Sequence, residues 1–422
     1  MRPFISLLAA GAAALAGAVI GSSTGAESIT PERIAGLPQQ KRTQFAAYLR
    51  RSTEQEAADH AALAAELKSA GLSEPLIPPS GGAARSTPLD RPDDWYATPE
   101  ARRIADIVVS FQTPAGGWSK NLNLTDHARR PGEHYAGNNL SRFLTPGDFD
   151  TPRDPKWNYV GTLDNDATNT QLEFLARVAA AKPEDSAAYR RAFLRGIEYL
   201  LAAQFPNGGW PQVYPLEGGY HDAITFNDGA VCETLRLLHR AAGGRSPFDF
   251  VPAEVRKRAA AAVNRGVECI LAAQIVENGR RTVWGQQHDA LTLAPVAGRN
   301  YEPAALCSAE SGALLEFLME LPKPNAAIAR AVGDGVAWLG KVAIHDRAYA
   351  RGPAGGILVD RPGAPAIWAR YYQIGADRPI FGDRDKSIHD SVEELSQERR
   401  RGYSWYTTAP HAAIDRYKTW RK

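Results

Sequence analysis

"QFPNGGWPQ" at residues 204–212 and "QTPAGGWSK" at residues 112–120 are near copies of one another, and each follows an apolar run of helical spacing. A third, more divergent copy lies within "LAAQIVENGRRTVWGQQHD" at residues 271–289. Glycine favours helix ends, and tryptophan can pack either on a core or on a ligand. The copies therefore predict equivalent helix ends in successive helical hairpins.

The rest of the chain alternates helical runs with long polar loops. In each run the apolar residues recur three and four positions apart, whereas strictly alternating strand patterns are few. Long loops between helices are uncommon unless they have a function. We therefore expect an all-α fold: an α/α barrel, toroid-like, built of helical hairpins, with long loops forming a groove at one end. The expected helices span roughly 99–112, 166–181, 186–204, 228–242, 252–274, 303–321, 325–341 and 390–400.

Three segments are predicted along the chain. Arg2 and the apolar run "FISLLAAGAAALAGAVIG" indicate a signal peptide over residues 1–26, cleaved near Ala26, and hence a secreted or periplasmic protein. A membrane anchor is the alternative, but the run is short for a span. Residues 27–95 are predicted to be an N-terminal helical extension with a Pro/Gly/Ser linker, and residues 96–422 to be the barrel domain.

Composition narrows the class of partner. A hydrophobic content of 44% is enough for a large core, and the formal net charge of +2 gives no nucleic-acid footprint. Cys232, Cys269 and Cys307 are widely spaced in apolar surroundings and form no metal-binding pattern. Buried thiols are expected, with one disulfide left open by the oxidising compartment.

Two helix starts carry more oxygen ligands than a cap needs. Asp164, Asn165 and Asp166 precede one expected helix, and Asn227 and Asp228 precede the next. One Asp or Asn in each group could be an ordinary N-cap. Carboxylate and amide oxygens are also what calcium prefers, and two such helix starts at equivalent hairpin ends could share one ion.

Two later loops are rich in arginine and aromatic residues. Residues 283–311 contain Arg299, which could instead form an ordinary ion pair with Glu302, and residues 367–385 contain Arg370, Arg378 and Arg384. Arginine suits bidentate recognition of carboxylates, although any one of these could be a solvated surface residue. No nucleophile elbow, P-loop or H-E-x-x-H zinc motif is present in the sequence.

Taken together, these stretches resemble the pectate lyases of polysaccharide lyase family ten. The resemblance rests on "QTPAGGWSKN", "TLDNDATNTQLEFLARV", "QFPNGGWPQVYP", "ITFNDGAV", "WGQQHDALTLAPVAGRNYEPA", "WARYYQIGADRPIFGDRD" and "GYSWY", in that order over about residues 99–406.

The resemblance implies a secreted, calcium-dependent lyase that acts on polygalacturonate, with residues 96–422 as its catalytic domain, and we expect a monomer. It assigns Asp164, Asn165 and Asp228 to calcium, with Asp164 also near the substrate, and Arg299 to removal of the proton. It assigns substrate binding to Arg370, Arg384, Lys120 and Asn121, and we expect Trp118 to contact substrate as well. No nucleic-acid partner is expected, and no membrane partner after signal cleavage.

The implied reaction is a β-elimination. A cation on the uronate carboxylate acidifies the carbon-5 proton, a base removes that proton, and the bond from carbon 4 to the glycosidic oxygen breaks. Arginine normally stays protonated, so we expect calcium and neighbouring arginines to lower the pKa of Arg299 and the activity to have an alkaline optimum.

Three alternatives remain at this stage. An inverting glycoside hydrolase could use Asp164 and Asp228 as acid and base. A non-catalytic pectin-binding protein could keep the scaffold alone. A terpene cyclase shares the Q-x-x-x-G-x-W repeat, but "LDND" is not the acidic motif of those enzymes.

Overall fold

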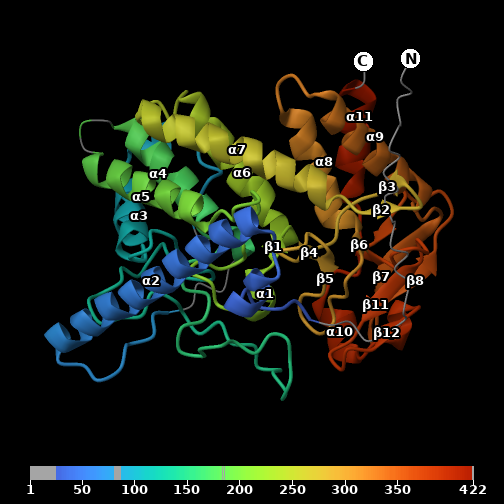
Figure 1. Cartoon of the computed structure of the whole chain (residues 1–422), viewed down its shortest axis with the longest axis horizontal. Coiled ribbons are helices and arrows are strands. Elements are labelled where there is room, and N and C mark those ends of the chain that lie inside the picture. The colour runs from blue at the N-terminus through green and yellow to red at the C-terminus, as the bar shows by residue number, and fades with distance from the viewer. Residues whose placement is uncertain (1–24, 80–86, 183, 185, 421–422) are drawn as a thin grey trace, which may run out of the picture.

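The computed structural model describes residues 25–79, 87–182, 184 and 186–420 (Figure 1). Most of the predicted signal peptide lies outside these residues. The helices that build the body are α1 (Pro31–Ala35), α2 (Gln39–Ala70), α3 (Pro99–Ser110), α4 (Asn169–Ala181), α5 (Ala187–Ala203), α6 (Ala230–Gly243), α7 (Ala253–Ala273), α8 (Ser308–Glu320), α9 (Ala326–Lys341), α10 (Gln397–Gly402) and α11 (Pro410–Trp420).

Successive helices pair as predicted by the repeated helix ends. α4 packs on α5, α6 on α7, and α8 on α9, while α4, α6 and α8 also follow one another in an inner row. Local sequence sets several of the ends: Thr98 caps α3 by accepting a hydrogen bond from the Ala101 amide at 3.2 Å, and α6 ends at the left-handed Gly244. α3 and α11 lie at opposite ends of this array, so the array is open (Figure 1).

The prediction of an all-α barrel is wrong. The chain is 46% helical and 12% strand, and its strands form several small sheets. The paired strands are short enough to escape a search for alternation: β1 (Ile224–Thr225), β2 (Val276–Glu277), β3 (Arg280–Arg281), β4 (Gln287–His288), β5 (Pro295–Val296), β6 (Leu306–Cys307), β7 (Arg347–Gly352), β8 (Gly355–Asp360), β9 (Trp368–Ala369), β10 (Tyr371–Tyr372), β11 (Pro379–Gly382), β12 (Ile388–His389) and β13 (Tyr406–Thr407).

The strands lie in the loops that join the helices and in the region after α9. β10 is central to a four-stranded sheet in the order β12–β11–β10–β6, and β4 pairs with β1 and β5. Five strands of these two sheets lie between Gln287 and Gly382, the segment that carries Arg299 and Arg370. The loops expected to be irregular are thus held by backbone pairing between strands. Most of these strands have only two residues, which is too short to give an alternating sequence pattern.

The three sequence copies, which we call the Gln-Gly-Gly-Trp joints, each connect one helical hairpin to the next. Gln112, Gln204 and Gln274 each donate from Nε2 to two backbone carbonyls, one in their own loop and one on the next outer helix, at 2.8–3.0 Å. Trp118, Trp210 and Trp284 are fully buried, and each indole donates back to the helix that precedes it, at 2.7–2.8 Å. The divergent third copy is therefore a true structural repeat.

Close approach explains the glycines of these joints. Gly116 has φ 108° and a Cβ there would lie 2.6 Å from the Arg195 carbonyl oxygen, while Gly208 has φ 96° and a Cβ would lie 2.0 Å from the Arg265 carbonyl oxygen. A side chain at either position would push the loop off the next outer helix. The repeat therefore fixes how successive hairpins are spaced.

The N-terminal extension packs on this array. Tyr48 of α2 donates to the Ala203 carbonyl at 2.9 Å and its ring meets Phe205, at the second Gln-Gly-Gly-Trp joint. The domain boundary near residue 95 stays a prediction. Cys232, Cys269 and Cys307 are buried free thiols. No helix among the described residues is long and apolar enough to cross a membrane.

Candidate active site

The two Asn/Asp helix starts come together at one end of the inner helices. Short 3-10 turns, η2 (Asp164–Asp166) and η5 (Asn227–Gly229), precede α4 and α6 and pack against each other. Asn165 and Asp228 both adopt the left-handed conformation, with φ 52° and 50°. Asn and Asp tolerate this geometry better than most residues, and strained backbone of this kind gathers at functional sites.

Asp164 forms an ion pair with Lys120, a residue that the resemblance assigned to substrate binding. The Lys120 ammonium lies 2.5 Å from Asp164 Oδ2 and 3.4 Å from the centre of the Tyr159 ring. Burial opposes ionisation of Asp164, but the charge and hydrogen bond of Lys120 outweigh it, so the pKa of Asp164 lies below its ordinary value. Asn121 accepts a hydrogen bond from Asn165 at 3.2 Å. This bond links the Lys120–Asn121 segment to the Asp164–Asn165 segment a second time.

Asp228 faces the same acidic corner. Asp228 is exposed at this corner, and partial desolvation together with the charges of Asp164 and Glu310 raises its pKa to about 6. Because the carboxylates of Asp164 and Asp228 repel each other, binding of a cation between them would be favourable. Within the described ranges no group of three or more His, Cys, Asp or Glu side chains is placed to hold a metal, so any ion here relies on two carboxylates and on amide oxygens.

Arg370 reaches this corner from the C-terminal region. It pairs with Glu310 at the start of α8 and donates to Asn227 Oδ1 at 3.1 Å. Burial opposes its charge, but Glu310 outweighs burial and raises the pKa of Arg370 well above its ordinary value. Glu310 was not predicted, although "SAES" marks it as the acidic residue of a helix start at the same end as η2 and η5.

Arg299 forms the predicted pair with Glu302, and the pair is not exposed. Arg299 Nη2 lies 2.7 Å from Glu302 Oε1, and Glu302 is only 2% exposed and also accepts from Tyr403 at 2.9 Å. Burial would lower the pKa of Arg299, but Glu302 outweighs it and raises that pKa well above its ordinary value. The direction is opposite to the lowering expected from calcium and neighbouring arginines.

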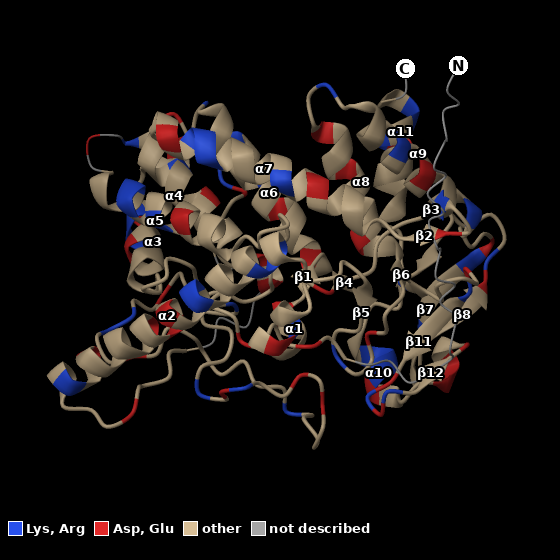
Figure 2. Ribbon diagram, in the orientation of Figure 1, with Lys and Arg blue, Asp and Glu red and all other residues tan. Residues whose placement is uncertain are grey.

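Arg299 and Arg384 line one cleft of about 440 Å³. Arg384 pairs with Glu398 of α10 at 2.8 Å and lies over the rings of Phe143 and Tyr301. The side chains around the cleft are mostly cationic, polar or aromatic: Lys120, Asn139, Ser141, Arg142, Phe143, Asp150, Tyr159, Arg299, Tyr301, Arg384, Arg399 and Tyr403. Figure 2 shows the basic stretch of α10 beside the C-terminal sheets.

One predicted contact has a different place. Trp118 is fully buried and its indole donates to the Val108 carbonyl at 2.7 Å. It packs the core behind Lys120 rather than lining the cleft, because it belongs to the structural joint. The repetition in the sequence could have indicated this structural role, because a tryptophan that recurs at three equivalent positions is expected to pack the core.

Sequence analysis also missed a hydrogen-bonded chain of four polar residues, two of which, Asp150 and Tyr159, line the cleft. Asp150, Tyr220, Tyr159 and His221 form a continuous chain of hydrogen bonds of 2.8–2.9 Å. Their separation along the sequence hid this relationship. His221 is 2% exposed and lies at the inner end of the chain.

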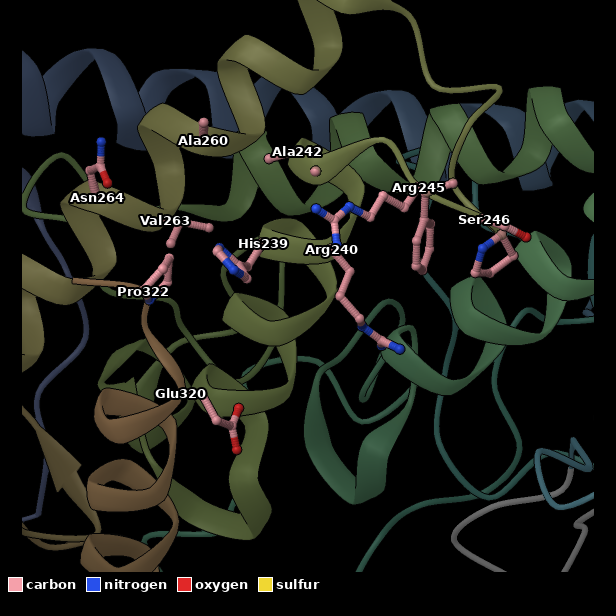
Figure 3. A pocket seen from close by; sticks show the side chains of 13 residues that line it. His239, Arg240, Ala242, Arg245, Ser246, Ala260, Val263, Asn264, Glu320 and Pro322 are labelled. Carbon is pink, nitrogen blue, oxygen red and sulfur yellow. The ribbon is translucent and has the colours of Figure 1, made fainter. Parts of the chain in front are cut away.

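A second cavity, of about 870 Å³, lies at the opposite end of α6 from Asp228 (Figure 3). His239, Arg240 and Arg245 line it together with Glu320, and it contains none of the predicted site residues. Glu173 accepts from Arg240 at 2.7 Å. The predicted site residues therefore lie at the other end of the helices, near η2 and η5.

Comparison with known proteins identifies the chain as a polysaccharide lyase. It belongs to the pectic acid lyase family, which residues 112–414 match. No curated protein sequence is detectably similar to the chain. Family membership decides against the hydrolase and cyclase alternatives.

Two solved structures of a family 10 polysaccharide lyase from Cellvibrio cellulosa are similar. A mutant in complex with trigalacturonic acid is 34% identical, with a TM-score of 0.66, over 78% of this chain and 95% of that one. A second structure of the lyase is also 34% identical, with a TM-score of 0.65, over 80% of this chain and 99% of that one. The resemblance seen in the sequence motifs is thereby confirmed.

Proposed function

We propose that the chain is an exported pectate lyase that cleaves polygalacturonate by calcium-assisted β-elimination and leaves 4,5-unsaturated oligogalacturonides. The observation that carries the proposal is the cationic cleft of Lys120, Arg299 and Arg384 beside the carboxylates of Asp164 and Asp228. Polygalacturonate carries a carboxylate on every sugar, which such a cleft neutralises at several points. The trigalacturonic acid bound by the Cellvibrio relative supports the same substrate class.

Asp164, Asn165 and Asp228 are the residues that would hold calcium. Two carboxylates and an amide oxygen suit a hard cation, and their incomplete number leaves room for an oxygen of the substrate carboxylate. When bound, the ion would withdraw charge from that carboxylate and so acidify the carbon-5 proton. The pKa of Asp228, raised by partial desolvation and by its acidic neighbours, supports a site that is under-neutralised without a cation.

The arginines divide the remaining work. Arg370 and Arg384 orient uronate carboxylates, each already positioned by a buried or half-buried glutamate, Glu310 and Glu398. Arg299, in the cleft, accepts the carbon-5 proton when it is neutral. Because Glu302 favours the charged form of Arg299, only alkaline conditions supply the neutral base, and an alkaline optimum follows.

Products formed in ¹⁸O-labelled water test elimination directly. Hydrolysis places one labelled oxygen in each new reducing end, whereas elimination adds no water and leaves a mass lower by one water at the unsaturated end. Mass spectrometry of early products should show the unlabelled, unsaturated series. A labelled, saturated series would refute the proposal.

A further inference from the structure

Most of the basic side chains that line the 440 Å³ cleft are already paired with carboxylates. The pairs are Lys120 with Asp164, Arg299 with Glu302, and Arg384 and Arg399 with Glu398. A cation in such a pair can still orient a substrate carboxylate with its remaining hydrogen-bond donors. Its charge is compensated, however, so it attracts a further anion less strongly than an unpaired cation does.

Arg142 is the exception among these cations. It lines the same cleft and is exposed, and in the described parts of the chain no Asp or Glu forms an ion pair with it. Its guanidinium lies 4.9 Å from the centre of the Phe143 ring. The positive charge of Arg142, together with its planar fork of donors, is therefore available to an anion that enters the cleft.

The loop that carries this arginine, residues 137–147, has turns but no helix or strand. At one end of the loop, Asn139 Oδ1 accepts a hydrogen bond from Asn121 Nδ2 at 3.3 Å. At the other end, the Gly147 carbonyl accepts one from Lys386 Nζ at 2.8 Å. The loop is thus fixed at both ends to segments that carry predicted substrate-binding residues.

Phe143 connects Arg142 to one of those substrate-binding residues. The centre of its ring lies 4.5 Å from the guanidinium of Arg384, in addition to its contact with Arg142. The ring lines the cleft and is 36% exposed, so the two guanidinium groups cover only part of it. Each cation–π contact restrains the arginine that makes it. Phe143 therefore sets the position of Arg142 relative to Arg384, which is itself held by Glu398.

We propose that Arg142 binds a free uronate carboxylate of the substrate and makes the protein discriminate against the methyl ester of that sugar, with Phe143 as a positioning residue. This inference rests on the proposed pectate lyase function. A carboxylate carries charge and accepts both donors of a guanidinium fork, whereas a methyl ester is neutral and has one oxygen blocked. Because the charge of Arg142 is uncompensated, an ester costs more there than at a cation that keeps its own glutamate.

The test is a cycle between the side chain and the ester. The ligands are trigalacturonate and its three monomethyl esters, and affinities are measured by calorimetry in the Arg299→Ala background, so that the ligand stays intact. We expect Arg142→Ala to weaken binding of trigalacturonate about 10-fold, and to weaken one of the three esters less than about 2-fold. The other two esters should lose as much as the free acid. Equal losses for all four ligands, or no loss for any, would overturn the assignment.

Further variants separate recognition from structural damage. Arg130→Ala removes an exposed arginine that precedes the loop and does not line the cleft, and should change every affinity less than about 2-fold. Arg142→Lys keeps the charge but not the fork, and should give a loss of about 3-fold. Phe143→Leu should reduce the penalty for the same ester and Phe143→Tyr should restore it. An unchanged penalty in Phe143→Leu would contradict the positioning role.

Turnover of polygalacturonate gives a second readout. Arg142→Ala should raise KM and change kcat less than about 2-fold, because Arg299 is untouched. The rise in KM should shrink as ionic strength increases from about 0.05 to about 0.5 M, since salt screens an exposed charge. A salt-independent rise would indicate a structural effect and contradict the proposal. If the wild-type protein forms no unsaturated product, the proposed function fails, while the trigalacturonate affinities still test Arg142.

Discussion

Arg299 Nη2 lies 2.7 Å from Glu302 Oε1, and Glu302 is nearly inaccessible to solvent. The pair couples a proposed base to an acid whose pKa, despite burial, is lowered to about 2 by that same arginine. Glu302 therefore stays ionised across the working pH range and sets how alkaline the medium must be before Arg299 becomes neutral.

Replacing Glu302 by glutamine should move the activity profile toward lower pH. Activity rises with pH as Arg299 loses its proton, and Glu302 raises the pKa of Arg299. A neutral amide removes this effect, so the rising limb of kcat should shift down by about one pH unit or more. Steady-state rates on polygalacturonate from pH 6 to 11 measure the shift.

Glu398→Gln is the matched control, because Glu398 pairs with Arg384 instead of Arg299. It should weaken substrate binding without moving the limb. An unchanged limb in Glu302→Gln would argue against Arg299 as the base.

Arg299→Ala should separate binding from cleavage. The variant keeps Arg370, Arg384 and the acidic corner, so its affinity for trigalacturonate should fall less than about 10-fold while kcat falls at least about 1,000-fold. Calorimetric titration and product formation measure the two quantities. Arg384→Ala should show the reverse balance, with KM raised more than kcat is lowered, and equal profiles for the two variants would contradict the division of roles.

Asp228→Asn should make calcium harder to bind. One of only two carboxylates would be lost, so the calcium concentration giving half-maximal rate should rise at least about 10-fold. Asp166→Asn is the control, since Asp166 lies in η2 but was assigned no calcium contact. A similar rise in both variants would place the ion elsewhere.

The Gln-Gly-Gly-Trp joints predict an effect on stability. A Cβ on Gly208 would lie 2.0 Å from a backbone oxygen of α7, so Gly208→Ala should lower the free energy of unfolding by at least about 2 kcal/mol. Gly363 has a similar positive φ of 75° but open space around it, and Gly363→Ala should cost about 1 kcal/mol. Denaturant melts compare them, and equal losses would show that the close approach is unimportant.

The repeated motif predicted the helical hairpins because each copy solves the same local problem. Gln204 satisfies two carbonyls, Trp210 returns to its own helix, and Gly208 allows close contact, all within nine residues. The small sheets were missed because pairs such as Ile224 with His288 join distant loops through strands of two residues. No local pattern encodes such pairing.

In the candidate site, too, some residues could be found from local sequence motifs and others only from contacts between distant segments. Asp164, Asp228 and Arg299 stand in short motifs whose chemistry could be inferred from neighbouring letters. Glu310 and the chain from Asp150 to His221 depend on contacts between residues 60 or more positions apart, and they appear only when the loops are folded.

Ultraviolet absorbance of polygalacturonate mixed with the purified protein, with added calcium and again with EDTA, tests the central claim most directly. The account predicts a steady rise from the new carbon–carbon double bond, abolished by EDTA and restored by excess calcium. A rise that persists in EDTA would contradict the role of calcium. New reducing ends without any rise in absorbance would contradict elimination itself.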